Sequence, residues 1–149
     1  MALEYRLTLS SETPVDQVAQ RAFPDPAERP TGTPPLLSAD FYDRFGFEVS
    51  MRAGRNGYLD VESDDGSWEW EPGAYVSTTF RMDKFADESW TVTNMLTIVR
   101  RVLDTGPEDA AFVFNGDILL FTRFGGVVRK HRRETWWSSE PTAGGLIPG

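Results

Sequence analysis

Apolar and polar residues alternate along several stretches of this chain, which is the pattern of β-strands with one buried face. In residues 3–9 the odd positions are apolar and the even positions are polar. Residues 74–82 keep an inward-facing set at every second position in the same way. Further strands are predicted over residues 36–43, 47–52, 110–114, 117–123 and 127–135.

Two stretches show the helical period instead. A short helix is predicted over about residues 14–23, where apolar side chains recur every three or four positions. A longer helix is predicted over residues 88–104, with Asp87 as its N-terminal cap. Gly106 and Pro107 follow it and favour its end, because glycine accepts the left-handed cap and proline cannot continue a helix.

Residues 24–35 contain five prolines, which predicts an extended surface loop.

A strongly acidic β-hairpin is predicted over residues 58–72. Asp65-Gly66 is a two-residue turn signal, so Glu62 would pair with Glu69 and Asp60 with Glu71. Side chains alternate across a strand, so these four carboxylates would share one face. Like charges directly opposite one another destabilise a sheet. A shift of the turn would change this register, because a three-residue loop slips the pairing.

These elements predict an α+β fold, with a curved, mostly antiparallel sheet and one long and one short helix. The pair Asn115-Gly116 is the strongest hairpin signal, and its two flanking strands are apolar on both faces, so we expect them centrally in the sheet. A single domain is expected over residues 1–137. Residues 138–149 are polar and contain glycine and proline, which predicts a flexible C-terminal tail.

Composition narrows the classes of function. The 149 residues carry a net charge of −8 and no cysteine, which excludes disulfides and thiolate chemistry and disfavours binding to nucleic acid. An acidic surface instead attracts a basic protein. The N-terminus lacks a basic region followed by an apolar run, and no stretch approaches the length of a membrane span. We therefore expect a cytoplasmic protein with no membrane contact.

The acidic hairpin is the first candidate site. It is interpreted as a docking surface for a basic partner, and the alternatives are a divalent-cation site, a carboxylate pair for glycoside chemistry, or a solvated face neutralised by the chain's own arginines. No loop has the spacing of calcium ligands, so no metal and no cofactor are expected. The predicted partner-binding residues are Asp60, Glu62, Glu69, Glu71, Asp64, Asp65, Tyr58 and Trp137.

A basic run at residues 129–133, followed by Trp136 and Trp137, is the second candidate site. Cations beside aromatic rings can bind single-stranded nucleic acid, but this run is better explained as a charged edge strand that balances the acidic hairpin. His131 is the only histidine and lies inside the run, which disfavours it as a general base. No catalytic residue is predicted.

Several short motifs together resemble small bacterial immunity proteins of the Sit type, which is named for swarming-inhibition toxins exchanged between kin cells. The resemblance covers residues 1–137 and lies in ALEY at 2–5, WEWE at 68–71, FRMDK at 80–84, NML at 94–96 and NGD at 115–117. It implies a cytoplasmic, non-enzymatic protein that binds and neutralises one cognate toxin of a polymorphic toxin system. The alternative from the residues alone is a small carboxylate-based enzyme or a ligand- or metal-binding domain.

Overall fold

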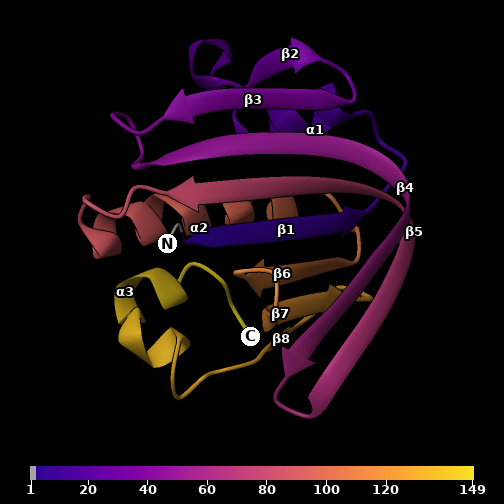
Figure 1. The fold of residues 1–149 in the computed structure, drawn as a ribbon, viewed down its shortest axis with the longest axis vertical. Helices are drawn as coiled ribbons and strands as arrows, with labels where there is room; N and C mark the ends of the chain where they lie inside the picture. Colours follow the sequence, from indigo (N-terminus) through magenta and orange to yellow (C-terminus); the bar gives the residue numbers. More distant parts are fainter. Residues whose placement is uncertain (1–2) are drawn as a thin grey trace.

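Eight strands form one sheet, and two helices pack on one of its faces in the computed structural model, which describes residues 3–149 (Figure 1). The strand order is β2-β3-β4-β5-β1-β6-β7-β8, and all neighbours in this order are antiparallel. The strands are β1 (Glu4–Ser10), β2 (Thr31–Thr33), β3 (Leu36–Phe41), β4 (Phe47–Ser63), β5 (Gly66–Met82), β6 (Ala110–Phe114), β7 (Ile118–Phe124) and β8 (Val127–Lys130). The predicted α+β class is confirmed.

The main core lies between the sheet and the helices α1 (Val15–Ala22) and α2 (Glu88–Asp104). The inward-facing positions of β1 and the apolar stripe of α2 are buried there, as the alternation and the helical period predicted. The Asp87 carboxylate caps α2 by accepting a hydrogen bond of 2.9 Å from the Trp90 N–H. Among residues 3–149, no helix is long and apolar enough to cross a membrane.

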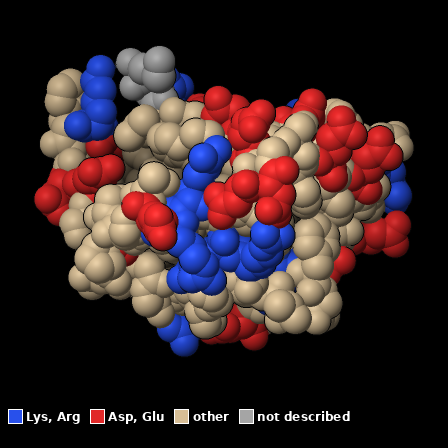
Figure 2. All heavy atoms as spheres, turned by 90° about the horizontal axis from the view of Figure 1, so that it is seen from below, with Lys and Arg blue, Asp and Glu red and all other residues tan. Residues whose placement is uncertain are grey.

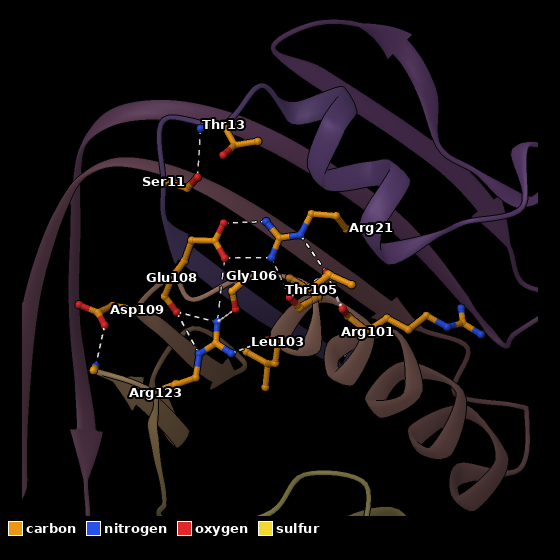
Figure 3. A network of polar contacts seen from close by, with 12 residues as sticks. Ser11, Thr13, Arg21, Arg101, Leu103, Thr105, Gly106, Glu108, Asp109 and Arg123 are labelled. Atoms are coloured by element: carbon orange, nitrogen blue, oxygen red, sulfur yellow. Dashed lines mark hydrogen bonds and ion pairs between the residues drawn. The ribbon is translucent and has the colours of Figure 1, made fainter.

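The C-terminal end of α2 is held by two largely buried arginines from other elements (Figure 3). Arg123 on β7 donates to the carbonyls of Leu103, Gly106 and Glu108, at 2.5 to 3.0 Å. Arg21 on α1 donates to the Val102 carbonyl at 2.7 Å and pairs with the Glu108 carboxylate at 2.6 Å. The last turn of a helix leaves its carbonyls without partners, so these arginines supply the missing donors. No pattern in the sequence predicted this cluster.

The opposite face of the sheet, called here the outer face, changes character from one side to the other. Across β3, β4, β5 and β1 it is polar, whereas Ala111, Val113 and Leu119 make it apolar on β6 and β7. The end of β4 and the start of β5, residues 58–71 and called here the hairpin arm, fold back over this apolar part (Figure 1). Within the arm, the Glu62 N–H donates to the Asp117 carbonyl next to β7. Burial of apolar surface explains why the arm folds there.

β4 and β5 form one hairpin of two 17-residue strands, where the sequence predicted strands at residues 47–52 and 74–82 that are separate from the acidic hairpin at residues 58–72. The strands are instead continuous, and their ladder is bulged where the register shifts on both sides of Gly57. A side-chain carbon at Gly57 would lie 2.7 Å from Pro72, and one at Gly54 would lie 2.5 Å from the Tyr75 hydroxyl. The glycines therefore bend the hairpin without breaking it, as bulges do.

The register at the hairpin tip also differs from the prediction. The two-residue turn is Asp64-Asp65, so Ser63 pairs with Gly66, and Asp60 lies opposite Glu69. The Ser63 hydroxyl stabilises this turn by accepting from the Asp65 N–H at 3.1 Å and donating to the Gly66 carbonyl at 2.8 Å. The slip is two residues, so each side chain stays on its predicted face. Only one pair of carboxylates is now directly opposed, which reduces repulsion.

The segment for which the sequence predicts a flexible tail contacts the domain. After β8 the chain forms a 3-10 turn, η2 (Trp137–Ser139), and a single helical turn, α3 (Pro141–Gly144). Ala143 and Ile147 belong to the main core, and the exposed fraction of Ile147 is 0%. The Lys130 ammonium lies over the Trp137 ring and donates to the Gly144 carbonyl at 3.0 Å. Another 3-10 turn, η1 (Pro26–Glu28), lies in the proline-rich segment.

Candidate functional site

The acidic face, defined as Asp60, Glu62, Glu69 and Glu71, lies on the solvent side of the bent hairpin arm. All four side chains are exposed, and none has an ion-pair partner within 4.0 Å among residues 3–149. The opposite side of the arm is apolar, and Val61 is buried against the outer face of the sheet. Trp70 packs edge-on against Phe124 at 5.3 Å between ring centroids. The apolar side therefore fixes the arm and leaves the acidic face open.

Tyr58 lies beside the acidic face, as predicted. Its side chain is 55% exposed, and its hydroxyl donates to the Glu69 carboxylate at 3.1 Å. This hydrogen bond holds the pKa of the Tyr58 hydroxyl above its ordinary value. An exposed aromatic ring thus lies next to the carboxylates. Tyrosine is among the residues that most often carry the binding energy of protein–protein interfaces.

Asp64 and Asp65 at the hairpin tip are engaged by the basic run. Arg129 pairs with Asp65 at 2.7 Å, and the Asp64 carboxylate accepts from the Arg132 N–H at 3.1 Å. Figure 2 shows this end of the molecule, with a compact group of basic side chains surrounded by acidic ones. The interpretation of the basic run as a counterbalance to the hairpin is thus confirmed at the tip, while the four carboxylates of the acidic face stay unpaired.

His131 contacts the hairpin tip through a hydrogen bond to the backbone of Asp64. Its Nδ1 accepts a hydrogen bond of 3.1 Å from the Asp64 N–H, which requires the imidazole to be unprotonated at that nitrogen. The side chain is buried, and this burial, together with the charge of Arg129, lowers the pKa of His131. The lone histidine therefore has a structural contact in this position.

Trp137 does not belong to the exposed surface. Its exposed fraction is 6%, and its indole N–H donates to the Leu120 carbonyl at 3.0 Å. Trp136 is also partly buried, and its indole N–H donates to the Tyr5 hydroxyl at 3.2 Å. The prediction that Trp137 anchors a partner is therefore wrong for this conformation, because the ring fills the core. The stacking ring required by the nucleic-acid alternative is missing for the same reason.

Two adjoining hollows lie between the hairpin arm and the outer face, with volumes of about 550 and 560 Å³. Both are lined by Arg6, Thr79, Tyr58 and Leu59. Asp60 and Glu4 line the first hollow, and both side chains are exposed to solvent. Among residues 3–149, no group of three metal-ligating side chains comes together.

Comparison with known proteins gives one match. A model of the family described as SitI3-like matches residues 3–141. No curated protein matches the chain. No solved structure matches it either.

Proposed function

Because this chain belongs to the SitI3-like family, whose members have a toxin-immunity role, we propose that it binds and neutralises one cognate toxin of a polymorphic toxin system. In this proposal the protein is not an enzyme, and it meets the toxin in the cytoplasm. Family membership supports the immunity role, and the surface of the hairpin supports the mode of binding.

The observation that carries the binding mode is the unpaired acidic face. Four carboxylates with no internal cation repel one another, so they cost stability unless an outside cation neutralises them. A basic toxin would supply those cations, and complementary charge also speeds association. The net charge of −8 adds a long-range attraction for the same kind of partner.

The hairpin arm is also held in one conformation before binding. Its apolar side packs on β6 and β7, and its tip is bound by Arg129, Arg132 and His131. A surface that is ordered beforehand loses little conformational entropy when a partner docks, which raises affinity. The same contacts keep Tyr58 beside the acidic face.

The test is to tag the chain in its native cell, isolate what co-purifies, and measure the affinity of the isolated toxin. In one variant the four carboxylates of the acidic face become amides (Asp60→Asn, Glu62→Gln, Glu69→Gln, Glu71→Gln). The matched control carries the same charge change on exposed carboxylates elsewhere (Asp16→Asn, Asp43→Asn, Asp104→Asn, Glu134→Gln).

We expect the acidic-face variant to bind the toxin at least about tenfold more weakly, because each charge-assisted contact contributes about 1.5–3 kcal/mol. The control variant changes the net charge by the same amount, but its substitutions lie outside the acidic face. It should therefore lose far less affinity for the toxin. Equal losses in both variants would show that only overall charge matters. Unchanged protection of cells by the acidic-face variant would contradict the proposed surface.

A further inference from the structure

The outer face of the sheet carries a regular array of polar side chains beneath the hairpin arm. One row across the sheet is Arg6, Thr79 and Ser50, because these residues are paired on β1, β5 and β4. The next row is Thr8, Ser77 and Arg52. These six residues are called here the hydroxyl groove, and each lines at least one of the two hollows.

The two arginines of the groove lack an internal counter-charge. No carboxylate oxygen within residues 3–149 lies within 4.0 Å of the Arg6 or Arg52 guanidinium. Arg81 on the same face differs, because it lies between Glu4 and Glu48 in the neighbouring row. The Arg6 Nε donates to the Thr79 hydroxyl at 3.1 Å, and the other Arg6 nitrogens have no hydrogen-bond partner among residues 3–149. Glu4 and Asp60 line the first hollow beside Arg6, whereas the second hollow is lined by both arginines and by no carboxylate of residues 3–149. The part of the groove in the second hollow therefore offers positive charge in a protein that is negative overall.

The hairpin arm makes the groove continuous with the acidic face. Tyr58 and Leu59 line both hollows from the arm, and the Tyr58 hydroxyl contacts Glu69 of the acidic face. A partner that covers the acidic face therefore also meets the mouth of the groove. The two surfaces have opposite charge, so they select different groups on the partner.

The chemistry of the groove decides what can fill it. An apolar plug would strip water from the hydroxyls and guanidinium groups and leave them without partners, which costs free energy. A carboxylate would instead form charge-assisted hydrogen bonds to the guanidinium groups, and arginine can bind a carboxylate with two parallel bonds. Hollows of this volume lie within the range of sites that hold ligands.

We propose that the hydroxyl groove receives a protruding, carboxylate-bearing segment of the same toxin whose basic surface covers the acidic face. This inference rests on the proposed function, since the toxin is its occupant. The two opposite charges would give the complex a fixed orientation: a toxin that presents only a basic surface could slide on the acidic face, whereas one that also fills the groove could not.

The first test removes the positive charge of the groove. Arg6→Met with Arg52→Met is compared with Arg100→Met plus Arg133→Met, two exposed arginines outside the groove, so both doubles change the net charge by the same amount. We expect the groove variant to bind the isolated toxin about tenfold or more weakly, and the control to bind within about twofold of the parent. Thermal unfolding verifies that both variants fold.

The second test fills the groove sterically. Ser77→Trp places a large ring among the lining residues, while Ser38→Trp places the same ring on the same face outside them. We expect only Ser77→Trp to block the toxin. A photo-crosslinking amino acid at the exposed Leu36, which lines the second hollow, should attach to a toxin peptide that contains Asp, Glu or a free C-terminus.

The outcomes separate the two proposals. If the groove variants bind normally while the acidic-face variant does not, the groove inference is overturned and the immunity proposal stands. A crosslinked peptide without any carboxyl group would also overturn the groove inference. If no toxin co-purifies with the parent chain, both proposals fail.

Discussion

At the scale of single residues, Arg123 has the most demanding position in the chain. It is a charged residue that is buried on β7, and the carbonyls at the end of α2 are what make its burial tolerable. Glu108 lies between Arg123 and Arg21, and the hydrogen bonds from Arg21 lower the pKa of its carboxyl. This cluster joins α1, α2 and the sheet at one point (Figure 3).

Arg123→Leu should lower the free energy of unfolding by about 3 kcal/mol, because three carbonyl groups would lose their donors. The control is Arg100→Met, which removes an exposed ion pair with Asp104 and should cost less than about 1 kcal/mol. Urea unfolding measures both. A small effect for Arg123→Leu would mean that water replaces the arginine without cost.

His131 should make stability depend on pH. Its pKa is lowered by folding, so between its folded pKa and about 6.5 the unfolded chain binds more protons. The stability from neutral His131 is therefore complete above pH 6.5 and is lost as pH falls toward the folded pKa. The charged groups that surround it are Asp64 and Asp65 on the hairpin, and Arg129 and Arg132 on its own segment.

His131→Asn tests this dependence, since an asparagine oxygen can still accept from the Asp64 N–H but does not titrate. The free energy of unfolding should fall less between pH 7.5 and pH 5 in the variant than in the parent chain. Burial raises the pKa of Glu140, so this residue also makes stability depend on pH. Its contribution is the same in both proteins and cancels when their pH profiles are compared. Parallel pH profiles for the two proteins would refute a titrating role for His131.

At the scale of elements, the bend of the β4–β5 hairpin determines where the acidic face points. A straight hairpin of this length would extend into solvent and expose Trp68 and Trp70. The bend places both rings against Phe124 and turns the carboxylates outward. The bend requires glycine at positions 54 and 57. A side chain at either position would collide with Tyr75, and one at Gly57 would also collide with Pro72.

Gly57→Val should destabilise the protein by about 1–3 kcal/mol, because the new side chain would collide with Pro72 and Tyr75. It should also weaken toxin binding by moving the acidic face. Gly144→Ala is the control, since its added carbon meets only ordinary contacts, 3.6 Å from the Trp137 ring. Thermal unfolding and affinity are measured together. Normal binding by a folded Gly57→Val protein would separate the bend from the function.

At the scale of the whole molecule, the end of the chain closes one side of the core. Residues after Trp137 contribute Ala143 and Ile147 to the same core as α2 and β1. The surface then divides into a basic patch beside the hairpin tip, an acidic face on the arm and a groove beneath it. Binding of the toxin as proposed requires the acidic face and the groove to be held in fixed relation by one folded unit.

Ile147→Ala should lower the free energy of unfolding by about 2–4 kcal/mol, the usual cost of a cavity left by a large aliphatic side chain. A chain that ends at Trp137 should be destabilised at least as much. Pro148→Ala is the control, since this neighbouring residue is exposed. Unchanged stability of both the Ile147→Ala protein and the chain that ends at Trp137 would support the flexible tail that the sequence predicts.

Much of the fold follows from local patterns. The helical period and the capping residues placed α2 at residues 88–104, because these signals act within a few residues of one another. Strand alternation also predicted the inward set of β1 and the shared face of the four carboxylates. The four carboxylates share that face although the strand pairing differs from the prediction, because a register shift of two residues leaves each side chain on the same face.

The tertiary structure decided what depends on contacts between distant segments. The hairpin bends because the apolar outer side of β6 and β7 is available to bury Trp70, and no local pattern contains that surface. Trp137 and Ile147 are buried for the same reason, although neither lies in a stretch with strand or helix periodicity. The contact of His131 with Asp64 spans 67 residues. Short-range periodicity thus determined the elements and their faces, while long-range burial determined which faces remain open to a partner.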